Sequence, residues 1–262
     1  MRSENKDPKD PSVRRMKKLR NFISNNLLNL QNFTNKLDVW YGVNSNSDHY
    51  QQLLHLRYQV YVMELNKNLP QADHERRLLP DHGDSNSWHF LIGAKWGKPL
   101  GCVRLHLGDE VPQDGLAEMG LADLSSCEIG RFGYVSKLIV DRSIRGQGAA
   151  IKMMFAMIEH ANQVTKGHGD YALFHCNPRL VTSYERLGFR RFGRPFIDCH
   201  VGLQIPMVNM LGDFRHFRAI NSPLTPIAKR FASSPSRLQE LHEEFLVKRL
   251  FTDNLSLKAS QK

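Results

Sequence analysis

One segment constrains the fold more than any other, because it combines a strand pattern, a glycine turn and a helix pattern in that order. The run YVSKLIV is apolar and rich in β-branched residues, as buried strands are. The charged turn DRSIRGQG follows, with Gly146 and Gly148 one residue apart. From Ile151 to Ala161, apolar residues are spaced three and four apart, which predicts one buried face of a helix. A strand that passes through a tight turn into a helix is typical of α/β folds.

Similar patterns predict the neighbouring elements of the same domain. Ser47 can cap a helix that runs to Tyr61, and a hairpin follows in WHFLIGAKWGKPLGCVRLHL. Further along, YALFHC predicts a short buried strand, PRLVTSYERLGF a helix that ends at Gly188, and DCHVGLQIPMV another strand. The order is helix, strand pair, strand, helix, strand, helix, strand. We therefore expect an α/β domain with a mixed sheet over residues 47–210.

The two ends of the chain differ from this domain in composition. Residues 1–46 form a basic extension, whose first dozen residues are polar and are expected to be disordered. The segment VRRMKKLRNFISNNLLNLQNF predicts an amphipathic helix that either packs on the domain or lies on anionic lipid. Residues 211–262 are predicted to form a helical annex, in which Ser236 can cap a helix docked on the domain or on a second copy of it.

Charge and cysteine usage narrow the class of partner and the compartment. The formal net charge is +10, and residues 1–40 hold nine Lys/Arg against four Asp/Glu, so half of the excess is local. A basic protein favours acidic partners, and because no nucleic-acid motif accompanies the charge we expect no nucleic acid. The scattered cysteines are Cys102, Cys127, Cys176 and Cys199. They indicate thiols in a reducing compartment, and apolar runs are too short for a bilayer, so we expect a cytoplasmic protein. Peripheral contact with the inner face of the membrane is the alternative for its basic end.

The glycine turn also predicts a binding site. Backbone N–H groups at a helix N-terminus attract phosphate, and the guanidinium of Arg145 suits bidentate contact with a phosphate group. A side chain at Gly146 or Gly148 would hold a ligand away from the backbone. The spacing excludes both common nucleotide fingerprints, because GxGxxG needs a glycine at Ile151 and the P-loop needs Gly-Lys-Ser/Thr. We interpret the turn as a phosphate cradle, with a plain strand-to-helix connection as the alternative.

Two motifs in this region resemble the GNAT superfamily of acyltransferases. KLIVDRSIRGQGAAIKMM is similar to the Arg-x-x-Gly-x-Gly/Ala motif, which follows the fourth strand and holds the diphosphate of coenzyme A. HCNPRLVTSYERLGFRRFG resembles the next motif, with Asn177, Tyr184, Gly188 and Phe189 in the matching places. The resemblance implies a GNAT fold, in which helices flank a mixed, mostly antiparallel sheet. The residues that it assigns to coenzyme A are Leu138, Ile139, Val140, Arg145, Gly146, Gln147, Gly148, Ala149, Ala150 and Asn177.

An ordered set of residues further upstream resembles a narrower group. The set consists of Arg57, Tyr61, Asp81, Asp84, Arg104, Glu128 and Arg131. It is similar to the pattern of acyl-homoserine-lactone synthases and long-chain N-acyl amino acid synthases. The resemblance implies transfer of a fatty acyl group from acyl carrier protein or coenzyme A to the amine of an amino acid or similar small molecule. It implies no tightly bound cofactor, and it assigns Arg57, Arg104 and Arg131 to substrate binding.

The chemistry of this transfer requires a base and an acid. An amine attacks a thioester only when neutral, and a free α-amino group has a pKa of about 8, so a proton acceptor is needed. Glu128 is the predicted base, although many GNAT enzymes carry a glutamate where Tyr134 stands here. Tyr184 is predicted to protonate the departing thiolate, with simple packing of its ring as the alternative. The oxyanion is expected to meet backbone N–H groups near residues 138–140.

The sequence therefore predicts an N-acyltransferase that moves a long-chain acyl group from a thioester to a small amine. The alternatives are an acetyl-coenzyme A-dependent N-acetyltransferase and, in another class, a sensor that binds acyl thioesters without turnover. Met153, Met154 and Met157 either fill the core or line an acyl tunnel. The twelve histidines show no spacing of a known metal site, so we expect no metal and interpret them as solvated loop residues.

Overall fold

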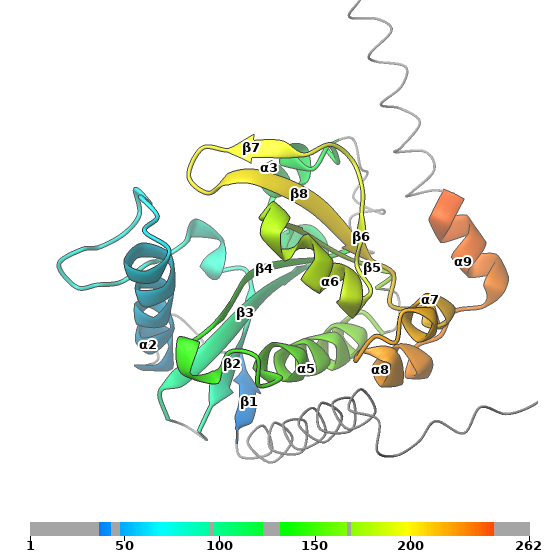
Figure 1. Ribbon diagram of the computed structural model, residues 1–262, viewed down its shortest axis with the longest axis horizontal. Helices are drawn as coiled ribbons and strands as arrows, with labels where there is room; N and C mark the ends of the chain where they lie inside the picture. The colour runs from blue at the N-terminus through cyan, green and yellow to red at the C-terminus, as the bar shows by residue number, and fades with distance from the viewer. Residues whose placement is uncertain (1–36, 43–47, 95–96, 123–131, 167–168, 244–262) are drawn as a thin grey trace, which may run out of the picture.

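The computed structural model describes residues 37–42, 48–94, 97–122, 132–166 and 169–243 (Figure 1). Glu128, Arg131, Ser47 and the predicted amphipathic helix of the basic extension lie outside these residues. No helix in the described part of the chain is long and apolar enough to cross a lipid bilayer.

A single eight-stranded sheet forms the centre of the described structure. Its strands are β1 (Asp38–Tyr41), β2 (Trp88–Gly93), β3 (Pro99–Leu107), β4 (Phe132–Val140), β5 (Tyr171–Cys176), β6 (Arg190–Arg191), β7 (Phe196–Asp198) and β8 (Gly202–Asn209). They lie in the order β1-β2-β3-β4-β5-β8-β6, and β7 pairs with β8. The pair β4–β5 is parallel and the other pairs are antiparallel. The predicted mixed, mostly antiparallel sheet is confirmed.

Helices cover both faces of this sheet (Figure 1). They are α2 (Asp48–Arg57), α3 (Gln113–Glu118), α5 (Ala149–Val164), α6 (Val181–Leu187), α7 (Phe214–Ala219), α8 (Thr225–Arg230) and α9 (Pro235–Leu241). Shorter helical turns are the π-helix η1 (Tyr58–Glu64) and the 3-10 turns η2 (His82–Asp84), η3 (Gly108–Glu110), η4 (Arg142–Ile144) and η5 (Pro178–Leu180). Helix α5 packs on β2, β3 and β4, whereas α2 packs on β3.

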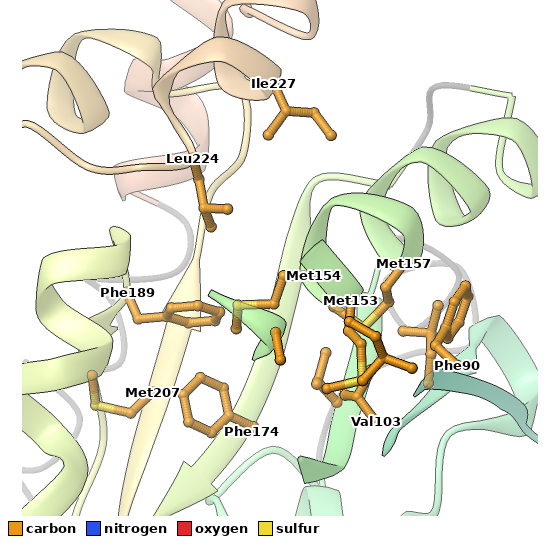
Figure 2. Packing of buried hydrophobic residues seen from close by; sticks show 14 of the residues in the cluster. Phe90, Val103, Met153, Met154, Met157, Phe174, Phe189, Met207, Leu224 and Ile227 are labelled. Atoms are coloured by element: carbon orange, nitrogen blue, oxygen red, sulfur yellow. The ribbon is translucent and has the colours of Figure 1, made fainter. Parts of the chain in front are cut away.

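Strand alternation decides which helix covers which face. Phe90 and Val103 belong to the core beneath α5, whereas their neighbours Leu91 and Cys102 belong to the core beneath α2. Successive side chains of a strand point to opposite faces, so α2 and α5 lie on opposite sides of the sheet. Figure 2 shows the larger core, in which the methionines of α5 meet side chains from the sheet, α7–α8 and the segment before β6.

Both ends of the chain contribute contacts to the domain. β1 comes from within the segment assigned to the basic extension, and it pairs with β2 at the edge of the sheet. At the other end, Phe217 and Leu224 are buried in the core beneath α5, so α7 and α8 of the predicted annex pack on the domain. The cap of α9 is Ser234, whose Oγ accepts from the backbone N–H of Arg237, and not Ser236. The pairing of β1 and the burial of Phe217 and Leu224 depend on partners distant in the chain, which local sequence patterns do not encode.

Candidate active site

The main cleft opens where β4 and β5 separate within the sheet. Their parallel pairing joins Phe132–Tyr134 to Tyr171–Leu173. Beyond this point β4 continues to Val140 and β5 to Cys176, and residues of both strands line a cleft of about 1230 Å³. The cleft thus lies where two neighbouring strands of one sheet separate.

A bulge bends β4 at the mouth of this opening. The pairing of β3 with β4 shifts register between Cys102 and Arg104, and Lys137 has a φ of 54°. Non-glycine residues seldom adopt such a φ, and bulges bend a strand and increase its twist. Since the last pair with β5 is made by Tyr134, the bend falls where the two strands part.

The wall of the cleft toward α5 and α6 is apolar. It is lined by Val135, Met154, Phe174, Cys176 and Tyr184. Figure 2 shows Phe174 and Met154 within the core beneath α5, and the rings of Phe174 and Tyr184 have centroids 4.4 Å apart. Burial raises the pKa of the Cys176 thiol to about 11, so this thiol stays protonated at neutral pH. The wall offers hydrocarbon surface and no ionised thiolate.

The opposite wall is polar and rests on five charged residues, here called the ion cluster: Arg57, Asp81, Asp84, Arg104 and Lys137. Arg57 donates from Nη1 to both carboxylate oxygens of Asp84, at 2.8 and 2.7 Å. Arg104 Nη1 donates to Asp81 at 2.5 Å and to Asp84 at 3.0 Å. Lys137 Nζ lies 2.7 Å from Asp81 Oδ2. Three cations and two carboxylates leave the ion cluster with one excess positive charge.

The protonation states within the ion cluster follow from these pairs. Burial alone would raise the pKa of Asp84, but Arg57 and Arg104 outweigh it and hold that pKa below its ordinary value. Lys137 and Arg104 likewise outweigh burial at Asp81, whose pKa is lowered. Burial and the nearby cation of Arg57 lower the pKa of His89 to about 4, so its imidazole is neutral at physiological pH. Because their pKa values are lowered, the carboxylates of Asp81 and Asp84 are both ionised, and the neighbouring His89 is uncharged.

The glycine turn lies at the N-terminus of α5. Gly146 has a φ of 74° and Gly148 a φ of 79°, values that side chains other than glycine's rarely tolerate. A Cβ on Gly146 would meet nothing within 4 Å, so the surface over this turn is open. The first N–H groups of a helix lack intrahelical acceptors, and α5 provides such groups beside the cleft.

Arg145 stands between the glycine turn and the cleft and is engaged by a carboxylate that the sequence did not single out. Its Nε donates to the carbonyl oxygen of Val140 at 2.8 Å, which fixes the guanidinium at the end of β4. Its Nη1 and Nη2 both donate to Glu64 of η1, the latter at 2.7 Å. This hydrogen bonding lowers the pKa of Glu64, so the pair is ionic.

The second sequence motif supplies Asn177 and Tyr184 to the cleft wall. The side-chain oxygen of Asn177 accepts from the backbone N–H of Arg179 at 3.1 Å and so caps η5. Burial, followed by the neighbouring Cys176 and Tyr61, raises the pKa of Tyr184 well above its ordinary value. The phenol therefore stays protonated and keeps a proton to donate.

A hydrogen-bonded triad that sequence reasoning missed lies where β4 and β5 part. His175 Nε2 is 3.2 Å from Tyr134 Oη, and His175 Nδ1 is 3.1 Å from Gln204 Oε1. All three side chains line the cleft. The histidines were interpreted as solvated loop residues, which is wrong for His175 of β5 and for the buried His89 of β2 and His106 of β3. No spacing could reveal the triad, because its members come from three strands.

The structure brings some of the predicted site residues together and separates others. Those that line the cleft are Arg104, Leu138, Ile139, Val140, Arg145, Asn177 and Tyr184. The turn residues Gly146, Gln147, Gly148, Ala149 and Ala150 follow Arg145 at the start of α5 and are not part of the cleft wall. Arg57 is fully buried and is held by Asp84 instead of facing the cleft.

Known proteins resemble parts of the sequence and the fold. Glucosamine 6-phosphate N-acetyltransferase 1 of Oryza sativa subsp. japonica is 34% identical over 61 residues, which are 23% of this chain. The match spans 34% of that protein, so the chain covers about a third of the curated relative's length.

Among solved structures, the CoA-dependent acyl-homoserine lactone synthase MesI is similar with a TM-score of 0.52 and 16% identity. The match covers 70% of this chain and 95% of that one. The CoA-dependent acyl-homoserine lactone synthase BjaI, solved with SAM and isopentyl-CoA, has a TM-score of 0.50 and 13% identity, with coverage of 72% and 90%. At such identities these likenesses concern the fold, which is of the GNAT type.

A family model narrows the assignment beyond the fold. The model of the N-acyl amino acid synthase FeeM matches residues 52–213, a span that includes the ion cluster, the glycine turn and the His175 triad. Because this match covers more than half of the sequence, the chain belongs to the N-acyl amino acid synthase FeeM family.

Proposed function

We propose that this protein is an acyltransferase that moves a long-chain acyl group from a thioester carrier to the amine of an amino acid or similar small molecule. The observation that carries the proposal is the cleft between β4 and β5, which joins an apolar wall to a polar one beside the glycine turn. Membership of the FeeM family supports the same reaction.

Each part of the cleft suits one part of the reactants. The apolar wall with Met154 and Phe174 suits a hydrocarbon chain, since burial of each CH₂ contributes about 0.8 kcal/mol. The start of α5 and Arg145 suit the phosphate of coenzyme A or of the phosphopantetheine arm of acyl carrier protein. The excess positive charge of the ion cluster, presented at the cleft wall by Arg104 and Lys137, favours a carboxylate on the acceptor.

The proposed chemistry begins with attack of the neutral amine on the thioester carbonyl. Backbone N–H groups near residues 138–140 stabilise the tetrahedral oxyanion, and Tyr184 gives its proton to the departing thiolate. The sequence pattern predicts Glu128 as the base and Arg131 as a substrate-binding residue, and both lie outside the described residues. Arg57, which is buried away from the cleft, acts by holding Asp84 and through it Arg104, while Arg104 faces the substrate.

The finer assignments concern donor and location. We propose acyl carrier protein as a donor alongside coenzyme A, since an acidic carrier suits a chain with a net charge of +10. We place the protein in the cytoplasm, with the part of the basic extension that precedes β1 in contact with anionic lipid. Sedimentation with anionic vesicles and not with neutral ones would support this contact. Equal sedimentation with both, or with neither, would contradict it.

The test is mass spectrometry of lipid extracts from a bacterial host that expresses the protein or its Tyr184→Phe variant. We expect new N-acyl amino acids with the wild type and at least tenfold less with the variant, since acid catalysis contributes about 100-fold or more. Thiol release from acetyl-coenzyme A without long-chain products would favour the acetyltransferase. Binding of coenzyme A without either product would favour the sensor.

A further inference from the structure

The structure assigns His175 as the proton acceptor for the attacking amine, acting through Tyr134 and held in place by Gln204. This inference rests on the proposed acyl transfer and gives His175, the first residue of the second motif, a role that the resemblance does not assign. Its basis is the hydrogen-bonded triad at the point where β4 and β5 part.

The hydrogen bonds fix which nitrogen of His175 carries the proton. The Nε2 amide of Gln204 donates to the carbonyl oxygens of Gly202 and Leu203, at 3.2 and 3.0 Å. Its Oε1 therefore faces His175 Nδ1 as an acceptor, and Nδ1 must carry the hydrogen. Nε2 is left with its lone pair directed at Tyr134 Oη, 3.2 Å away.

Tyr134 completes the relay because its phenol keeps its proton. Burial raises the pKa of Tyr134 well above its ordinary value, so the hydroxyl donates to His175 Nε2. The ring is also confined, since a Cβ on Gly115 of α3 would lie 3.2 Å from Tyr134 Oη. Tyr134 and His175 both line the cleft in which the amine is proposed to bind.

Two carboxylates of the cleft, Asp81 and Glu64, are less suited to this role. Asp81 is bound by Arg104 and Lys137, and Glu64 is bound by Arg145. Such pairing lowers carboxyl pKa values and makes the carboxylates weak bases. A histidine is the side chain that ordinarily changes charge between pH 5 and 8, where an amine must be deprotonated.

Acidic and aromatic side chains lie around His175. Glu118 of α3 interacts electrostatically with His175, and Asp198 at the end of β7 lies near Glu118. Phe196 of β7 packs edge-on against the imidazole, with ring centroids 5.2 Å apart. Together with Tyr134 and Gln204, these groups come from α3, β4, β7 and β8.

The protons and bonds balance over one turnover. The ammonium substrate gives one proton to Tyr134 Oη while Tyr134 passes its own proton to His175 Nε2, which later releases it to water. The neutral amine then forms the C–N bond, and the C–S bond breaks as Tyr184 protonates the thiolate. The second proton lost from nitrogen restores Tyr184, so the products are an amide, a thiol and one released proton.

The experiment compares the pH dependence of kcat/KM in the wild type, His175→Gln and His200→Gln. His200 is an exposed histidine of the same cleft and serves as the matched control. We expect His175→Gln to lower kcat about 100-fold or more near neutral pH, with a much smaller change in KM. The deficit should shrink at pH 9 and above, where the amine loses its proton to water. His200→Gln should retain the wild-type profile.

Three results would overturn the assignment. Wild-type kinetics in His175→Gln would exclude His175, and an equal deficit at every pH would show that it only supports the structure. If the fall of kcat/KM at acidic pH disappeared in Glu128→Gln and remained in His175→Gln, the base would be Glu128. Wild-type protein that transfers no acyl group would instead refute the proposed function, and the proton-acceptor role with it.

A measurement that needs no turnover tests the geometry separately. Nitrogen-15 NMR of the imidazole in the full chain should show His175 with hydrogen on Nδ1, and Gln204→Leu should reduce this preference. Hydrogen on Nε2 in the wild type would contradict the relay whatever the activity.

Discussion

At the scale of single residues, the most consequential feature is a buried arginine held by a buried aspartate. The Arg57 side chain has no exposed surface, and that of Asp84 is 3% exposed. A buried ion pair adds little net stability, but loss of one partner leaves the other charge without compensation. Tyr50 also donates to Asp84, at 3.0 Å, so the carboxylate joins α2 to the polar wall of the cleft.

Asp84→Asn should therefore lower the free energy of unfolding by about 3–5 kcal/mol, because it leaves Arg57 buried beside a neutral amide. Urea denaturation at pH 7 measures this change. The control is Glu185→Gln, which removes an exposed ion pair with Arg191 and should cost less than about 1 kcal/mol. Equal effects of the two substitutions would contradict the importance of the buried pair.

The buried histidines make stability depend on pH. Burial lowers the pKa values of His89 and His106 to about 4, so between about pH 4 and 6.5 the unfolded chain binds one more proton at each. Stability should fall with falling pH across this window, by about 1.4 kcal/mol per pH unit for each histidine. His89→Gln should remove one such contribution from urea titrations at pH 4.5–6.5, and a slope parallel to the wild type would refute it.

At the scale of elements, one glycine allows the end of α6 to pack closely against α7. Gly188 ends α6 with a φ of 108°, and a Cβ there would lie 2.5 Å from the ring of Phe217. Gly146 has a similar backbone requirement but open space around it. The two positions therefore separate backbone strain from steric conflict.

Gly188→Ala should destabilise the protein more than Gly146→Ala. Strain alone costs about 1–2 kcal/mol at a positive φ, and at Gly188 the displacement of Phe217 adds about 1–3 kcal/mol. Thermal unfolding of both variants measures the difference. Phe217→Leu in the Gly188→Ala background should recover part of the loss; no recovery would mean that the ring is not the obstacle.

The same elements show how much the sequence could predict. The hairpin β2–β3, the strand β4, the helix α5 and the end of α6 at Gly188 follow from local patterns, and the structure has them. β1 and the burial of Phe217 could not be predicted, because each depends on a partner distant in the chain. The two GNAT-like motifs pointed to the cleft, whereas the contacts of His175 with Tyr134 and Gln204 and of Glu64 with Arg145 join residues distant in the chain and are seen only in the structure.

At the scale of the whole molecule, the separation of β4 and β5 forms the cleft on which each proposal for this protein depends. It exposes the apolar core beneath α5 on one side and the ion cluster on the other, within one cleft of about 1230 Å³. A hydrophobic chain and a charged acceptor need such opposite surroundings within reach of each other. The fold meets both needs by separating two neighbouring strands.

The most direct test of this account is transfer by the purified full chain. Palmitoyl-coenzyme A, palmitoyl-acyl carrier protein and acetyl-coenzyme A would each be incubated with a mixture of amino acids, and products identified by mass spectrometry. The account predicts N-palmitoyl amino acids from at least one long-chain donor, at least tenfold less with Tyr184→Phe, and little product from acetyl-coenzyme A. Transfer of acetyl groups alone, or undiminished long-chain transfer by Tyr184→Phe, would contradict it.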